Sequence, residues 1–150
     1  MEGSRCGVRL KSEKPLCEYR KKEDAEYYAC IPPKTLPCST LRTMRFAINV
    51  GESECNIALH INPRFQGCGP GVIVLNAMKD GSWGTEVRDE RNFPFRQGEE
   101  FEVSITFAND KFYISLHDGH MLEFPNRLEQ PQYSKIWFTA DVRITGIYVK

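Results

Sequence analysis

The side chains best suited to chemistry in this chain are polar groups that recur at alternate positions between residues 60 and 88. Side chains two residues apart point to the same face of a β-strand, so three neighbouring strands would present these groups on one sheet face. A turn at residues 79–82 would bring a tryptophan beside them. The candidate site residues are His60, Asn62, Arg64, Asn76, Trp83, Glu86 and Arg88.

This set of groups suits a neutral sugar, whose hydroxyls both donate and accept hydrogen bonds. Arginine and asparagine donate, glutamate accepts, and histidine does either according to its tautomer. A tryptophan ring offers a flat apolar platform for sugar C–H groups. Each hydroxyl that exchanges water for protein gains only about 0.5–1.5 kcal/mol. Several contacts must therefore act together, which predicts modest affinity and strong selectivity for hydroxyl stereochemistry.

The same residues allow two other interpretations. An Arg–Glu–Arg cluster on an exposed sheet can be an ion network without a ligand. A glycosidase would pair Glu86 with Asp80 or Asp89 as acid and base. Arg64 and Arg88 would keep Glu86 ionised and make it a poor general acid. No Ser-His-Asp or Cys-His signature occurs either, so we expect no enzyme and assign no catalytic residue.

The elements that must position these groups are short strands. From about Thr43 onward, apolar and polar residues alternate with period two, and no helical period persists beyond a turn. Turn residues separate the segments at 79–81, 109–111 and 117–119. The sequence predicts an all-β fold, with two antiparallel sheets packed as a sandwich. The alternating segments are 45–50, 56–62, 71–77, 101–107, 112–116, 136–140 and 142–149.

The first part of the chain has a different texture. Residues 1–26 are dense in charge and show no sustained apolar period, which is typical of a solvated arm or an irregular edge. We therefore predict a charged leader over 1–26 and the binding domain over 27–150. The prolines between Ile31 and Pro37 exclude a central strand from that stretch.

Length and charge exclude several classes of protein. One hundred and fifty residues suit one domain, and the twenty basic and twenty acidic side chains cancel. A balanced charge argues against nucleic acid or an anionic membrane as a partner. No apolar run reaches the eighteen residues that membrane insertion needs, and the N-terminus lacks the pattern of a secretory signal.

The six cysteines favour reduced thiols over a disulfide framework in a chain without a signal peptide. Four of them (Cys6, Cys17, Cys30 and Cys38) precede the alternating segments, where oxidation could link chains; inert thiols are an equally open alternative. No Cys-x-x-Cys pair occurs, and no cysteine lies near His117 or His120. We therefore expect no metal site and no cofactor.

Three blocks of the site region carry a resemblance to galectins: His60-Ile61-Asn62-Pro63-Arg64-Phe65, then Val74-Leu75-Asn76, then Trp83-Gly84-Thr85-Glu86-Val87-Arg88. The resemblance continues through residues 92–95 and 124–128 and covers 44–150, about two-thirds of the chain. It implies a jelly-roll sandwich like that of galectins and legume lectins. The implied function is that of a non-enzymatic lectin binding lactose or N-acetyllactosamine-type β-galactosides on one concave sheet face.

The resemblance also implies a role for each candidate residue. His60, Asn62 and Arg64 would bond the axial 4-hydroxyl of galactose. Asn76 and Glu86 would bond the 6-hydroxyl, with Trp83 stacked under the ring. Arg64, Glu86 and Arg88 would reach the neighbouring glucose or N-acetylglucosamine. Val74 would pack beneath the site.

Beyond the site, the implied partners are β-galactoside glycans on glycoproteins or glycolipids, with a homodimer left open. The implied location is the cytoplasm, with release from the cell by a route that needs no signal peptide. The alternative is a galectin-like structural or protein-interaction module whose sugar site is weak or silent.

Overall fold

The structure is a computed structural model that describes residues 5–12, 46–66, 70–96, 99–140 and 142–149. Regular structure within these ranges consists of β-strands. Among the described residues no helix is long and apolar enough to cross a membrane. The strands are β1 (Arg5–Ser12), β2 (Phe46–Ser53), β3 (Asn56–Arg64), β4 (Val72–Lys79), β5 (Ser82–Trp83), β6 (Val87–Asp89), β7 (Glu100–Ala108), β8 (Lys111–Leu116), β9 (Met121–Pro125), β10 (Lys135–Ala140) and β11 (Val142–Val149).

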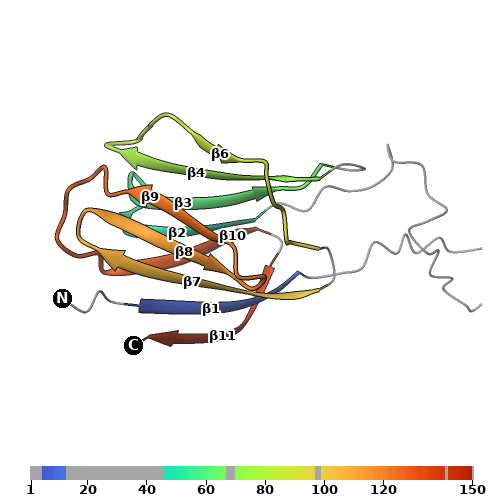
Figure 1. Cartoon of the computed structure of the whole chain (residues 1–150). Coiled ribbons are helices and arrows are strands. Elements are labelled where there is room, and N and C mark those ends of the chain that lie inside the picture. Colours follow the sequence, from blue (N-terminus) through green and yellow to red (C-terminus); the bar gives the residue numbers. More distant parts are fainter. Residues whose placement is uncertain (1–4, 13–45, 67–69, 97–98, 141, 150) are drawn as a thin grey trace, which may run out of the picture.

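The strands form two antiparallel sheets that lie face to face (Figure 1). The five-stranded sheet has the order β11-β1-β7-β8-β9. The six-stranded sheet has the order β10-β2-β3-β4-β5, and β6 also pairs with β4. The chain enters the six-stranded sheet at β2 and returns to the five-stranded sheet at β7. It crosses to the six-stranded sheet again for β10 and back for β11. The predicted all-β sandwich is confirmed.

The core lies between the sheets and follows the alternation seen in the sequence. Ile48, Ile61 and Leu75 are paired across β2, β3 and β4, and each is at most 2% exposed. The facing sheet contributes Val103 and Ile114, both fully buried. Each such side chain contributes about 1.5–3 kcal/mol when it leaves water. The inward set therefore fixes which residues of the same strands face outward.

The predicted turns are also confirmed. Asp80 and Gly81 join β4 to β5 with positive φ angles of 49° and 79°. Asn109 joins β7 to β8 with φ of 47°, and Gly119 joins β8 to β9 with φ of 85°. Asparagine, aspartate and glycine tolerate this left-handed region, which explains their places at the strand ends.

The leader prediction is wrong for residues 5–12. They form β1, which lies between β11 and β7 in the interior of the five-stranded sheet. Val8 and Leu10 are fully buried in the core. Only these two apolar residues alternate with Arg9 and Lys11, too few to give a clear period beside so much charge. Residues 13–45, with the predicted boundary at 26 and the prolines at 32–37, lie outside the described residues.

Strand β9 was likewise absent from the predicted set. Its inward residues are Leu122 and Phe124, which are 5% and 0% exposed. Two apolar residues are again too few to define a strand from sequence. Strand β1 pairs with β7 and β11, which lie far away in the chain, so a local pattern does not contain its partners. Strand β9 pairs with the adjacent β8, and its two inward residues join the common core.

Candidate functional site

The candidate residues lie on the outer face of the six-stranded sheet. His60 on β3 pairs with Asn76 on β4. Two residues further along, Asn62 on β3 pairs with Val74 on β4, which in turn pairs with Arg88 on β6. Directly opposed residues on neighbouring strands point to the same face. Val74 is fully buried beneath these polar side chains. The predicted placement on one face is therefore confirmed.

A chain of ion pairs crosses this face. Nη2 of Arg64 lies 2.5 Å from Oε1 of Glu86, and Nη1 of Arg88 lies 3.2 Å from Oε2 of Glu86. Nε of Arg64 also donates to Oδ1 of Asn62 at 2.9 Å. The hydrogen bond from Arg64 lowers the pKa of Glu86 below its usual value. The ion pairs hold these three charged side chains in place, and 35–46% of each side chain remains exposed, so a ligand can reach them.

His60 is held as a neutral hydrogen-bond acceptor. Its Nδ1 lies 2.6 Å from Oδ1 of Asn49 on β2. An amide oxygen only accepts, so Nδ1 carries the proton and Nε2 presents a lone pair. Burial, with the positive charge of Arg64 as a second cause, lowers the pKa of His60 from 6.5 to about 4. The imidazole is therefore uncharged at neutral pH.

Trp83 provides the flat surface expected from the sequence. It stands at the end of β5 with 49% of its surface exposed, and its ring centroid lies 4.7 Å from that of His60. The two rings are tilted by 57°. A half-exposed tryptophan leaves a large apolar area in water unless something covers it. The ring of Trp83 thus lies at one side of the polar side chains on this sheet face.

Asn76 differs from the other candidates because it is only 4% exposed. Its Nδ2 donates to the carbonyl of Gly84 at 2.9 Å, and its Oδ1 accepts from the amide of Ala77 at 2.8 Å. The side chain therefore ties β4 to the segment that carries Trp83 and Glu86. Asn76 therefore positions that segment.

Arg127 belongs to the site and was not among the predicted residues. Its Nη1 donates to the carbonyl of Thr85 at 2.7 Å and lies 3.3 Å from Oδ1 of Asn76. The guanidinium also lies 4.7 Å from the ring centroid of Phe124. A Cβ on Gly84 would come within 3.0 Å of Nη1 of Arg127, so glycine suits this close approach.

The sequence held partial signals for these positioning residues. Arg127 lies within residues 124–128, which share the galectin resemblance, but it is separated from Thr85 by 42 positions. No local spacing connects the two. Asn49 was detectable as the polar residue between Ile48 and Val50, although nothing in the sequence indicated that it contacts His60.

A second charged cluster lies just beyond Arg88. Asp89 is buried; Oδ2 accepts from Nη2 of Arg91 at 3.0 Å and lies 2.9 Å from Nε2 of His120. His120 follows the β8–β9 turn, so the contact joins the two sheets. The hydrogen bond from Arg91 is the main reason that the pKa of Asp89 lies well below its usual range. Asp89 is thus engaged away from Glu86 and does not form a carboxylate pair with it.

Metal and thiol chemistry find little support among the described residues. Within them, no three histidine, cysteine or acidic side chains come together in a group able to hold a metal ion. Cys55 has an exposed free thiol. The side chain of Cys6 and the whole of Cys17, Cys30, Cys38 and Cys68 lie outside the description, so thiol linkage stays a prediction.

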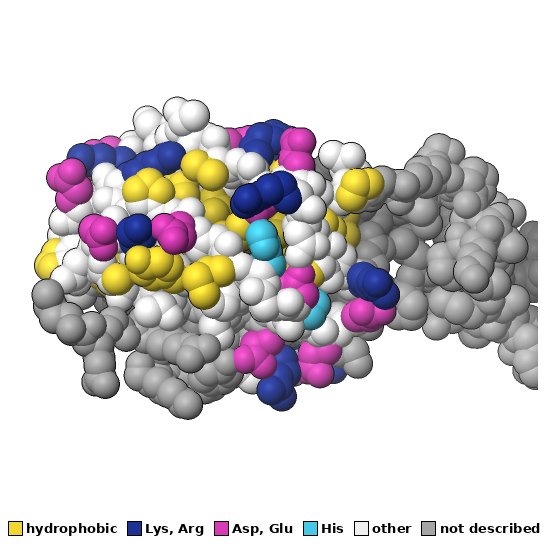
Figure 2. Space-filling model, in the orientation of Figure 1, with side chains coloured by type: hydrophobic (Ala, Val, Ile, Leu, Met, Phe, Trp, Pro, Cys, Tyr) yellow, Lys and Arg dark blue, Asp and Glu magenta, His cyan; other side chains and the backbone are white. Residues whose placement is uncertain are grey.

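Figure 2 shows acidic and basic side chains interspersed over the face that it presents.

Fold and site together define a two-sheet sandwich with a preorganised polar face flanked by an exposed tryptophan. The family model described as galactoside-binding lectin matches residues 29–149. The chain therefore belongs to the galactoside-binding lectin family.

Known proteins similar to this chain agree with that assignment. The β-galactoside-binding lectin of Electrophorus electricus is 44% identical over 112 residues, which cover 74% of this chain and 81% of that protein. Galectin-1 of Mus musculus is 43% identical over 66% of this chain and 73% of its own. An ancestral congerin structure matches with a TM-score of 0.74 and 36% identity, covering 99% of this chain and 92% of its own. The lactose- and MES-liganded congerin II structure has the same coverage, a TM-score of 0.74 and 30% identity.

Proposed function

We propose that this protein is a non-enzymatic lectin that binds β-galactosides of the lactose and N-acetyllactosamine type on the outer face of its six-stranded sheet. The observation that carries the proposal is the Arg64–Glu86–Arg88 ion-pair chain, which stays open to solvent beside the exposed ring of Trp83. Ion pairs on a surface contribute little stability. A fixed donor–acceptor array next to a bare aromatic ring is better explained by a ligand that needs both.

The axial 4-hydroxyl of galactose is proposed to meet His60, Asn62 and Arg64. The neutral tautomer of His60 leaves Nε2 to accept the hydroxyl proton, while Arg64 donates to the hydroxyl oxygen. An equatorial hydroxyl would leave these groups without a partner, and a site arranged to hydrogen-bond one hydroxyl disfavours an epimer that cannot reach it. The C–H face of the ring stacks on Trp83.

The remaining contacts follow from the same face. The 6-hydroxyl is proposed to meet Asn76 and Glu86, and the adjoining glucose or N-acetylglucosamine to meet Arg64, Glu86 and Arg88. Glu86 accepts while both guanidinium groups donate, so each sugar hydroxyl finds the complementary partner. Asn76 would bind with the amide N–H that does not contact Gly84.

Elution from a lactose column by free lactose tests the proposal directly. The wild-type protein is expected to be retained and then released by lactose. Trp83→Ala and Arg64→Ala are expected to abolish retention, because each removes at least about tenfold of affinity, while circular dichroism shows an intact fold. Absence of any lactose-dependent retention by the wild type would favour a structural or protein-interaction module instead.

The resemblance to galectins further supports a location in the cytoplasm with release by a route independent of a signal peptide. The glycan partners would then be those of glycoproteins or glycolipids outside the cell. A single site per chain cross-links glycans only if chains associate. Sizing chromatography with and without reductant would decide between a monomer and a homodimer, and secretion assays in the presence of a blocker of the classical pathway would test the route.

A further inference from the structure

Two tight turns lie side by side at one end of the six-stranded sheet. The β2–β3 turn spans residues 53–56, and the β4–β5 turn spans residues 79–82. Strands β3 and β4 are antiparallel neighbours, and Ile57 near the start of β3 pairs with Met78 near the end of β4. The two turns therefore project from the same edge of the sheet.

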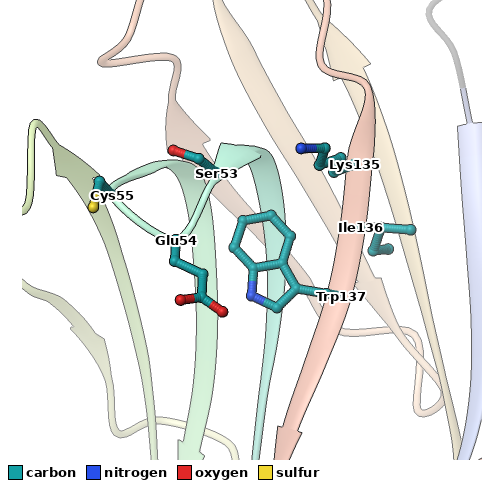
Figure 3. A pocket seen from close by; sticks show the side chains of 6 residues that line it. All are labelled: Ser53, Glu54, Cys55, Lys135, Ile136 and Trp137. Atoms are coloured by element: carbon teal, nitrogen blue, oxygen red, sulfur yellow. The ribbon is translucent and has the colours of Figure 1, made fainter.

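Two hydrogen bonds join the turns. The amide of Asp80 donates to Oδ1 of Asn56 at 3.0 Å, and the amide of Gly81 donates to the carbonyl of Cys55 at 2.9 Å. Figure 3 shows the β2–β3 turn from close by, with Cys55 on the side away from β10. The second bond is made by the main chain alone, whereas the first depends on the side chain of Asn56.

The β4–β5 turn needs such support. Its central residues Asp80 and Gly81 both have positive φ angles, 49° and 79°, as in a two-residue hairpin of type I′. Glycine adopts this conformation freely, but aspartate does so at some cost. A Cβ on Gly81 would meet no described atom within 4 Å. Hydrogen bonds rather than packing therefore fix the conformation of this turn.

The turn leads directly into the ring that is proposed to stack on the sugar. Strand β5 consists of two residues, Ser82–Trp83, and pairs with the last two residues of β4. Trp83 is 49% exposed, and its ring contacts that of His60. So short a strand with so exposed a side chain has little burial to hold it. The orientation of the indole therefore depends on the segments at either end of β5.

The segment after Trp83 is held separately. Asn76 donates to the carbonyl of Gly84, and Arg127 donates to the carbonyl of Thr85. These contacts do not involve the turn before Trp83. Loosening that turn is therefore expected to weaken the stacking contact while Glu86 keeps its two arginine partners.

We propose that Asn56 is a positioning residue for sugar binding, because its bond to the Asp80 amide fixes the turn that orients the ring of Trp83. This inference rests on the proposed function. Asn56 lies four residues before His60 on β3, about 13 Å along the strand, so it acts through the turn and not by touching the sugar.

Titration calorimetry with lactose tests this role. Asn56→Ala is expected to bind lactose about 2- to 10-fold more weakly than the wild type, because the turn loses one hydrogen bond that orders it. Asn56→Asp keeps an acceptor oxygen at the same place and is expected to stay within about twofold. Asn92→Ala is the matched control: this side chain is also half-buried, and it donates to Asp118 instead of the turn. Its lactose affinity should equal that of the wild type.

Fluorescence reports the ring itself. The chain has two tryptophans, Trp83 and Trp137, so Trp137→Phe leaves Trp83 as the single tryptophan. In this background and without ligand, Asn56→Ala is expected to increase the fast local motion of Trp83 in time-resolved anisotropy. Asn56→Asp and Asn92→Ala should not. A general loss of stability would leave this signal unchanged while urea unfolding shows that the protein is folded under the assay conditions.

The outcomes separate this inference from the proposed function. An unchanged lactose affinity in Asn56→Ala, an equal loss in Asn56→Asp, or unchanged motion of Trp83 overturns the positioning role and leaves the lectin intact. Should Asn56→Ala fail to fold, Asn56→Gln, which keeps the amide but displaces its oxygen, gives the same test. Failure of the wild type to bind lactose overturns the proposed function itself.

Discussion

Two carboxylates three residues apart, Glu86 and Asp89, have opposite surroundings. Glu86 lies between Arg64 and Arg88 on the outer face, with 35% of its side chain exposed. Asp89 lies on the inner side of β6 with 6% exposed, and contacts Arg91 and His120. Both carboxylates are ionised and both have a lowered pKa, Glu86 mainly through Arg64 and Asp89 mainly through Arg91.

The difference shows that burial decides whether an ion pair mainly positions side chains for a ligand or mainly stabilises the fold. Water screens the pairs of Glu86, so they add little to stability and mainly hold donors and an acceptor in position for a ligand. Asp89 is shielded from water and joins β6 to the turn of the facing sheet through His120, so its contacts bear on stability. We expect substitutions to separate these two roles.

The largest effect is expected from Glu86→Gln. The amide keeps the shape but loses the charge that orients Arg64 and Arg88, so lactose affinity should fall by at least about tenfold. The free energy of unfolding should change by no more than about 0.5 kcal/mol, because the pairs are exposed. Titration calorimetry and urea unfolding measure the two quantities. A large loss of stability with unchanged affinity would reverse the comparison.

Asp89→Asn is expected to show the opposite behaviour. The free energy of unfolding should fall by about 1–3 kcal/mol, because Arg91 and His120 lose a charged acceptor, while lactose affinity changes by less than about threefold. Because the folded pKa of Asp89 is lowered, its contribution is present above the ordinary aspartate pKa and is lost as pH falls below it. The free energy of unfolding, measured at several pH values between 7 and 3, should therefore fall less with pH in the variant than in the wild type. Glu90→Gln, at a carboxylate with 74% exposure, is the control and should leave stability unchanged.

The smallest effect concerns His60 and pH. With a pKa of about 4, His60 stays neutral as pH falls from 7.5 to about 5.5, so lactose affinity should be constant over that range. Affinity should weaken only as the pH approaches 4, where Nε2 becomes protonated and stops accepting. Between pH 6.5 and 4 the unfolded chain binds the proton more readily, so His60 lowers stability as pH falls. A proton NMR titration of the His60 ring with a midpoint near 6.5 would contradict this view.

The sequence was sufficient for the inner and outer faces of the longer strands. Ile57, Leu59 and Ile61 alternate with polar neighbours, and the outward position of His60 and Asn62 follows from period two alone. The glycines and asparagines at the turns were readable for the same reason, since their backbone preferences are local. The three-block resemblance added the ligand class.

The sequence was not sufficient where partners lie far apart in the chain. Strand β1 looked like solvated leader because Val8 and Leu10 show no period, and it becomes a central strand only between β7 and β11. Arg127 joins the site only because the β9 end lies beside the segment that carries Thr85 and Gly84.

The alternation of residues 60–88 thus determined by itself that His60, Asn62, Arg64, Asn76, Trp83, Glu86 and Arg88 could share a face. The tertiary structure alone decided that Glu86 bridges two arginines in the open while Asp89 is buried against the facing sheet. The physical reason is that side-chain direction is a local property of a strand, whereas burial and contact depend on which distant strands pair with it.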